Sequence, residues 1–167
     1  MTFTRSGFGM FNMSEIKDIE MLQRTWGYKI PDSPTINIVD IKNCLAQLQG
    51  ELTEIERDVI IPYMEGADTE TVLKGLRDVL VDLQVFTYQL IVRSGLAQQF
   101  SGDFQKILEN NLTKVHDSEE EALKTVDFYR AKGVLTVAQY VPEMNVWVVK
   151  DQDDKVRKPY NFKEVEL

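Results

Sequence analysis

Apolar residues recur at helical spacing through most of residues 13–112. The pattern predicts helices at 13–26, 40–61, 69–93 and 97–112. Pro62 is expected to end the second helix, because proline lacks a backbone N–H and restricts the preceding residue. Either Asp68 or Thr69 should cap the third helix, and Gly95 should end it. The fourth helix is expected to bend or break near Gly102.

The pattern changes after Lys114. A helix is expected from Asp117 or Ser118 to Gly133. Strand-like runs at 134–141 and 146–150, joined by the turn PEMN, predict an antiparallel hairpin. The chain is therefore predicted to be mainly α, with an antiparallel helical bundle over residues 1–115 and a small α+β appendage over residues 116–167. His116 lies in the polar turn before the appendage helix and is expected to be exposed.

Composition narrows the classes of function. The chain has 167 residues and a net charge of −8, which argues against a general nucleic-acid binder. No apolar run approaches the ~20 residues that span a membrane. Cys44 is the single cysteine, so an intrachain disulfide and a multi-thiolate zinc site are excluded. The N-terminus has no long apolar segment followed by a cleavage site, and a cytoplasmic location is expected.

Two pairs of carboxylates lie on the second and third predicted helices. Glu51 and Glu54 are three residues apart, and Asp78 and Asp82 are four apart. Either spacing places both members of a pair on one helix face. Oxygen ligands of this kind favour Mg²⁺, Mn²⁺ or Ca²⁺. A divalent cation would also allow this acidic protein to bind a phosphate chain, because the cation inverts the local field.

Each acidic pair has an alternative interpretation as an ordinary ion pair. The glutamate pair is close to Arg57, and a solvated surface ion pair there is common. The aspartate pair has apolar neighbours that predict a buried helix, packed either among several neighbours or in an oligomer interface. Buried carboxylates repel each other unless a cation bridges them. Lys74 and Arg77 are the alternative partners of the aspartates.

The order of these motifs resembles the all-α nucleoside triphosphate pyrophosphohydrolases, the superfamily of MazG and phosphoribosyl-ATP pyrophosphohydrolase. The family pattern is E-E-x-x-E on one helix and E-x-x-D on the next, often followed four residues later by another acid or amide. GELTE at 50–54 matches the first motif, and GLRDVLVD at 75–82 matches the second. IKDIEMLQRTWGYKIPDSPT, NNLTKV and the C-terminal segment resemble a branch often encoded by bacteriophages and bacteria. The resemblance therefore covers almost the whole chain.

The resemblance implies a MazG-like bundle that hydrolyses a (deoxy)nucleoside triphosphate to the monophosphate and pyrophosphate, with Mg²⁺ or, as a substitute, Mn²⁺. The implied metal ligands are Glu51, Glu54, Asp78 and Asp82. One of the two glutamates would orient or deprotonate the attacking water. Glu54 is the first candidate for this role and Glu51 the second. Family members close their pocket by dimerising, so a homodimer or a dimer of dimers is expected. A phage-encoded protein of this kind would act in the cytoplasm of the host.

Candidate substrate ligands follow from the same resemblance. Lys114 is a candidate phosphate ligand with Asn111 beside it in the matching motif, and Lys158 is a weaker candidate. Ordinary solvated surface is the alternative interpretation for both lysines. The base would be read by polar groups such as Asn43 and Gln47, or by aromatic stacking.

Two glycines depart from the family pattern. Gly50 replaces the first glutamate of E-E-x-x-E, and Gly75 replaces the glutamate of E-x-x-D. Three outcomes are open: a site with fewer ions, recruitment of Asp58 or Asp82, or lost activity that leaves a nucleotide-binding or regulatory helical dimer. Glycine inside a helix costs about 1 kcal/mol relative to alanine. Close packing or clearance for a substrate is the expected reason for such a residue.

Overall fold

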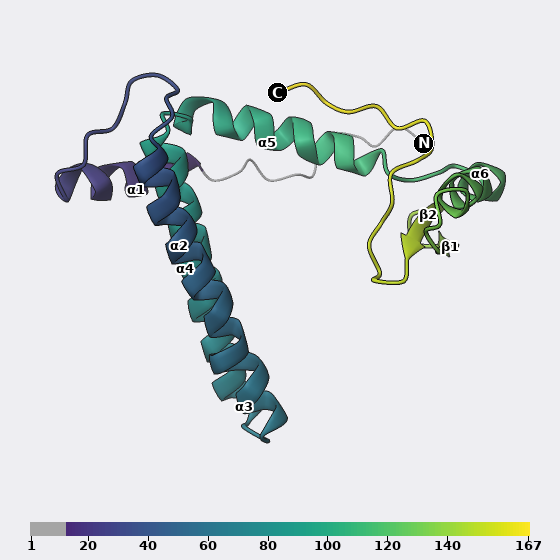
Figure 1. Ribbon diagram of the computed structural model, residues 1–167, viewed down its shortest axis with the longest axis horizontal. Coiled ribbons are helices and arrows are strands. Elements are labelled where there is room, and N and C mark those ends of the chain that lie inside the picture. The colour runs from purple at the N-terminus through teal and green to yellow at the C-terminus, as the bar shows by residue number, and fades with distance from the viewer. Residues whose placement is uncertain (1–12) are drawn as a thin grey trace. The chain divides into compact units, whose positions relative to one another are not determined.

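The computed structural model describes residues 13–167, with the side chains described from residue 14 onward. The protein is mainly helical, with a two-stranded antiparallel sheet near its C-terminus (Figure 1). The chain divides into two compact units, one ending at Ser101 and the other comprising Gly102–Leu167. The sequence pattern places this boundary after residue 115 instead. Among the described residues, no helix is both long and apolar enough to cross a membrane.

The helices of the N-terminal unit follow the predicted pattern closely. They are α1 (Met13–Thr25), α2 (Ile38–Glu54), the π-helix η1 (Ile55–Ile60), α3 (Ile61–Met64) and α4 (Thr69–Arg93). The predicted cap of α4 is confirmed, because the Asp68 side chain accepts a hydrogen bond of 3.0 Å from the Thr71 backbone N–H. Gly95 follows the end of α4 with φ of 68°, a conformation that favours glycine.

Pro62 does not end the second helix where the sequence predicts. The helix widens at η1, where the backbone N–H of Ile61 donates to the Glu56 carbonyl five residues earlier. Pro62 then occupies the first turn of α3, directly after the wider turns of η1. The expected break at Gly102 is also absent, since α5 (Ala97–Leu112) runs through this residue without interruption.

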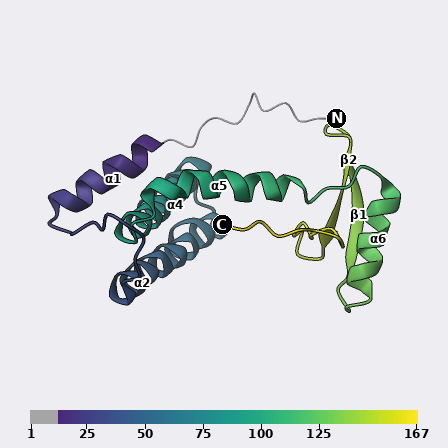
Figure 2. The same cartoon turned by 90° about the horizontal axis from the view of Figure 1, so that it is seen from above.

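The core of the N-terminal unit lies between α1 and α4, while α2 runs alongside α4 (Figures 1 and 2). A buried apolar cluster is formed by Ile16, Tyr88, Ile91 and Val92. Arg93 is also buried at the end of α4, where its guanidinium donates to Gln23 at 2.7 Å and lies 3.8 Å from the centre of the Tyr28 ring. Asp40 of α2 lies 3.6 Å from the same guanidinium. Charge and aromatic contacts therefore tie α4 to α1 and α2.

The helix α4 is not buried on all sides, contrary to the prediction. Leu73, Leu80 and Val81 are 50%, 52% and 58% exposed. The packed neighbours of α4 are α1, α2, η1 and α3, and they leave this face of the helix uncovered. Of the two predicted settings for so apolar a helix, burial among neighbours within the chain is therefore wrong.

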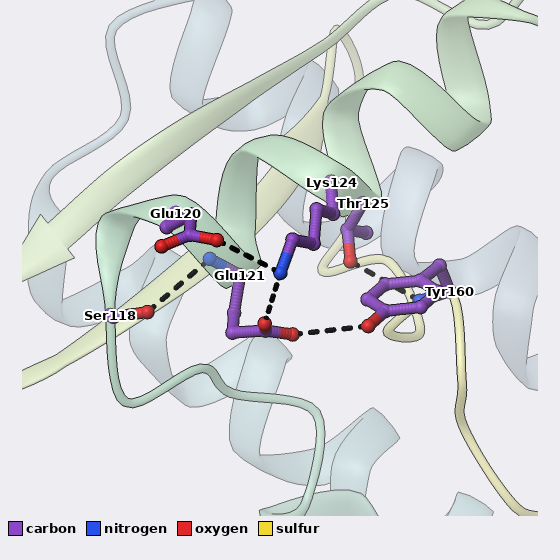
Figure 3. Close-up of polar contacts among 6 residues, drawn as sticks. All are labelled: Ser118, Glu120, Glu121, Lys124, Thr125 and Tyr160. Atoms are coloured by element: carbon purple, nitrogen blue, oxygen red, sulfur yellow. Dashed lines mark hydrogen bonds and ion pairs between the residues drawn. The ribbon is translucent and has the colours of Figure 1, made fainter.

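The C-terminal unit contains the predicted helix and hairpin. Helix α6 (Glu119–Arg130) is capped by Ser118, whose Oγ accepts from the Glu121 N–H at 3.3 Å (Figure 3). Strands β1 (Thr136–Val141) and β2 (Val146–Asp151) pair antiparallel, with Asn145 at φ of 52° in the turn between them. Figure 2 shows α6 alongside the hairpin. Ala122, Val126 and Val149 form their shared core.

His116 is buried, whereas the sequence predicts an exposed residue. Its side chain and backbone together are only 6% exposed. The backbone N–H and C=O of His116 each form a 2.8 Å hydrogen bond with the backbone of Trp147 on β2. This pairing draws the turn before α6 against the edge of the hairpin. A long-range bridge of this kind has no local signal in the sequence.

Candidate functional site

The two predicted acidic pairs meet across α2 and α4. Glu51 and Glu54 lie in the last turn of α2, and Asp78 and Asp82 lie on the neighbouring α4. Glu51 is half-buried, and its Oε2 atom is buried without a hydrogen-bond partner among the described residues. A buried carboxylate oxygen with no partner is costly. The position is therefore one where a cation would stabilise the fold.

The electrostatic setting of Glu51 shows that the four carboxylates are close. Burial raises the pKa of Glu51, and the negative charges of Glu54, Asp82 and Asp78 raise this pKa further. Arg57 acts in the opposite direction with a smaller effect. The charges of the other three acids therefore act on Glu51, and the four acids share one negative electrostatic environment.

Arg57 forms the local ion pairs that the alternative interpretation expects, but only with part of the site. Its guanidinium lies 3.0 Å from Glu54 and forms two hydrogen bonds, of 2.8 and 2.6 Å, to Asp58. These contacts raise the pKa of Arg57 and lower the pKa of Asp58. The Asp58 carboxylate is thus paired with Arg57, whereas the charge of Asp82 raises the pKa of Glu51. Of the two acids expected as replacements, Asp82 is therefore the one that belongs with Glu51, Glu54 and Asp78, which together are called the acidic cluster below.

The aspartate pair is less buried than predicted. Asp78 is exposed and Asp82 is half-buried, because this face of α4 is only partly covered within the chain. Neither aspartate forms an ion pair with Lys74 or Arg77 in the part of the chain that the structure describes. The alternative interpretation, in which Lys74 or Arg77 neutralises the two aspartates, is therefore wrong. Asp78 is solvated and does not require a cation to be stable. The buried oxygen without a partner belongs to Glu51, so a cation would stabilise that residue most.

The two unusual glycines have different surroundings. A Cβ atom at Gly75 would lie 2.8 Å from the backbone oxygen of Asp58, closer than real Cβ contacts allow. Gly75 therefore permits α4 to approach η1, which explains why an acid is absent there. A Cβ atom at Gly50 would have no atom within 4 Å. Packing gives no reason for Gly50.

The residues of the cluster suit a divalent cation by charge and by donor type. Their carboxylate oxygens are the ligands that Mg²⁺ and Mn²⁺ prefer. The Oε2 atom of Glu51 is buried without a hydrogen-bond partner, and a cation would supply the missing interaction. The described side chains do not, as placed, gather three His, Cys, Asp or Glu groups around one point. A bound ion would therefore be accompanied by rotation of these flexible side chains.

The predicted substrate ligands fall into two groups. Asn43 and Gln47 are exposed on α2, four residues apart and in register with Glu51 on the same helix face. Lys114, Asn111 and Lys158 belong to the C-terminal unit. The acids belong to the unit that ends at Ser101.

Lys114 and Lys158 meet at a ring that the sequence analysis missed. Their ammonium groups lie 5.9 and 5.3 Å from the centre of the Phe162 ring. Lys158 also pairs with Glu164, whereas Asn111 is exposed. Residues 158–164 lie in the last turn and the tail. The hydrophobic pattern has no helical or strand period there, so the sequence does not predict which side chains come together.

Comparison with known proteins adds no assignment. A scan against models of protein families gives no match, and a search of curated proteins finds no similar sequence.

Proposed function

We propose that this chain is a divalent-metal-dependent nucleoside triphosphate pyrophosphohydrolase with a MazG-like helical bundle. It would hydrolyse a (deoxy)nucleoside triphosphate between the α and β phosphates, releasing the monophosphate and pyrophosphate. The observation that carries the proposal is the buried, unpartnered oxygen of Glu51 amid three further carboxylates. An acidic group in that setting favours a bound cation, and a phosphate chain is the substrate that such a cation would attract.

In this proposal Glu51, Glu54, Asp78 and Asp82 hold Mg²⁺, with Mn²⁺ as a substitute. When bound, the metal supplies charge neutralisation for the phosphates and lowers the pKa of the attacking water. Glu54 is the first candidate, and Glu51 the second, for the residue that orients this water or accepts its proton. Glu54 lies 3.0 Å from Arg57, so the two must separate before the carboxylate is free to act.

The candidate substrate ligands are proposed for each unit separately. Asn43 and Gln47 lie two turns and one turn before Glu51 on the same face of α2 and would read the base. Lys114, with Asn111 and Lys158, would bind phosphate. Both lysines stand beside Phe162, and Lys158 is also paired with Glu164. The single buried thiol of Cys44 is compatible with activity in the reducing cytoplasm.

The exposed apolar side chains of α2 and α4 support a homodimer. Ile38, Leu45 and Leu52 are spaced by seven residues along α2 and are 57%, 51% and 56% exposed. Leu73 and Leu80 repeat the same spacing on α4. Apolar residues every seven positions form a seam for another helix. A second copy, with further dimerisation to a tetramer, would bury this seam and help to enclose a nucleotide.

The decisive experiment measures pyrophosphate release from a panel of ribo- and deoxynucleoside triphosphates, with Mg²⁺, with Mn²⁺ and with chelator. Glu54→Ala and Asp78→Ala should abolish release while leaving the circular dichroism spectrum unchanged. Glu70→Ala is the matched control, because Glu70 is an exposed acid in the first turn of α4. Full turnover in both cluster variants would disprove the assignment of the metal site.

A second candidate is a nucleotide-binding or regulatory dimer without catalysis. Two observations favour it: Gly50 removes one family acid without a packing reason, and Arg57 occupies Glu54. This candidate predicts metal-dependent binding of nucleotide with no release of pyrophosphate across the whole panel. Any metal-dependent turnover that Asp78→Ala abolishes would exclude it.

A further inference from the structure

The C-terminal unit contains a cavity that the proposed hydrolysis does not use. Its volume is about 420 Å³, within the range of roughly 300–1,000 Å³ that is usual for sites of small molecules. The cavity lies between the last turn of α5, the start of α6 and the tail. It is lined by Asn110, Thr113, Val115, His116, Asp117, Glu121, Pro159, Asn161, Phe162 and Lys163.

A buried imidazole forms part of this wall. His116 is more than nine-tenths buried, and its Nε2 atom has no hydrogen-bond partner among the described residues. Burial lowers the pKa of His116, although Glu121 and Asp117 oppose this effect, so burial favours the neutral form of the ring. A buried ring nitrogen without a partner is stabilised by a hydrogen bond, which a polar group of a ligand can supply.

The charges around the cavity nearly cancel. The Glu121 carboxylate is already held by Lys124 at 2.6 Å and by the Tyr160 hydroxyl at 3.2 Å (Figure 3). Asp117 and Lys163 remain, and neither forms an ion pair with a described residue. Their opposite charges offset each other at the wall itself. Lys114 and Lys158 approach the Phe162 ring but do not line the cavity, and Lys158 is paired with Glu164, so the wall itself suits a neutral group.

The remaining wall suits a flat ligand with a polar edge. Phe162 provides a half-buried aromatic ring, and Val115 and Pro159 provide aliphatic surface. Asn161 is exposed, and its amide offers both a donor and an acceptor. Aromatic surface with a nearby amide and imidazole is the combination by which proteins bind unpaired bases.

The C-terminal tail is fixed firmly enough to keep this wall in place. The Tyr160 backbone N–H donates to Thr125 at 3.2 Å, and the Tyr129 hydroxyl donates to the Lys158 carbonyl at 3.1 Å. The Asn110 amide, with its nitrogen toward the tail, lies 3.1 Å from the Lys163 carbonyl. Residues on both sides of Phe162 are therefore anchored, and the cavity is a built feature of the unit.

We propose that this cavity binds a nucleobase, with His116 and Asn161 hydrogen-bonded to its polar edge and Phe162 against its face. The choice of a nucleobase over other neutral heterocycles rests on the proposed function. The site itself is separate from the acidic cluster on α2 and α4. It would give the C-terminal unit a role in selecting or sensing nucleotides.

The test uses nucleosides, which carry no phosphate, and follows the imidazole signals of His116 by NMR in the intact chain without added metal. His116 is the only histidine, so the signals need no assignment. At least one of adenosine, guanosine, cytidine and thymidine should shift them with saturation. Phe162→Ala should weaken this binding at least about fivefold, and Asn161→Ala should weaken it as well. Gln139→Ala removes an exposed amide on β1 outside the cavity and should change nothing.

Three results would overturn the proposal. These are no saturable shift with any nucleoside, an equal shift with glycine or inorganic phosphate, or unchanged affinity in both wall variants. The result is independent of hydrolysis. Nucleoside binding without pyrophosphate release would leave this site standing and remove the proposed activity. Pyrophosphate release with an unresponsive His116 would do the reverse.

Discussion

At the scale of single residues, Glu51 determines how stability should depend on pH and metal. Its pKa in the folded chain is raised above the ordinary value of 4.5, so the folded state binds this proton more tightly than the unfolded chain. The resulting stability is present below pH 4.5 and is lost as the pH rises through the raised pKa. Metal-free protein should therefore show a falling melting temperature across that interval, and Glu51→Gln should flatten the fall.

Magnesium should reverse this behaviour, because a cation stabilises the ionised form of Glu51. The increase in melting temperature on adding Mg²⁺ should be larger at pH 8 than at pH 5 in the native chain. Glu51→Gln should nearly abolish this increase and should reduce pyrophosphate release by more than the ~10–100-fold typical of outer-shell metal partners. An equal effect of Mg²⁺ in both proteins would show that the ion binds elsewhere.

The two glycines give a matched pair of substitutions with opposite expected signs. Gly50→Ala should stabilise the chain by about 1 kcal/mol, because its Cβ enters open space within a helix. Gly75→Ala should destabilise it by about 1–3 kcal/mol, because its Cβ would press on the Asp58 carbonyl. Urea denaturation measures both through the midpoint at constant slope. Stabilisation of similar size in both variants would contradict the close packing of α4 and η1.

The sequence predicted the acidic cluster because helical spacing is a local property. Glu51 and Glu54 share a face whatever surrounds them, and so do Asp78 and Asp82. Spacing also allows Arg57 to pair with either glutamate, and it does not predict that Arg57 pairs with Glu54 and leaves the Glu51 oxygen without a partner. The burial of His116 depends on a strand thirty residues later, and local polarity suggested the opposite.

At the scale of elements, the predicted bounds agree best where a cap has an explicit residue. Asp68 and Ser118 begin α4 and α6 as expected, since their side chains satisfy orphan N–H groups. The disagreement comes at η1, where Pro62 was expected to stop the helix. A π-helix depends on a shifted hydrogen-bond register and on packing against Gly75, and neither leaves a pattern in apolar spacing.

The cap of α6 can be tested by its own reporter. Trp147 lies in β2 and Trp26 follows α1, so Trp26→Phe leaves one tryptophan, in the C-terminal unit, that can be excited selectively. In that background Ser118→Ala should lower the stability seen by Trp147 by about 1 kcal/mol, because the Glu121 N–H loses its acceptor. Ser118→Asp retains an acceptor and should cost much less. Equal losses in the two variants would show that the side-chain hydrogen bond does not stabilise the helix.

At the scale of the whole molecule, the two units divide the proposed chemistry. The acids and the exposed apolar seam belong to the unit that ends at Ser101, while the lysines and the cavity belong to Gly102–Leu167. The sequence predicted a change of architecture near residue 115, because the periodicity changes there. Contacts between distant residues place the division earlier, at Gly102 within α5. The sequence marks that position only by the glycine at which a bend or break of the helix is expected.

The exposed seam of α2 leads to a prediction about assembly. In a symmetric dimer each substitution acts twice, and burying one leucine contributes roughly 1.5–3 kcal/mol. Leu45→Glu should therefore weaken self-association by about 3 kcal/mol or more, a change of at least ~100-fold in Kd. Light scattering coupled to size exclusion should show a shift from dimer to monomer. Met64→Glu is the control, since Met64 is 80% exposed at the end of α3 and outside the seam. A native chain that is monomeric at high concentration, or a dimer unaffected by Leu45→Glu, would contradict this seam as the interface.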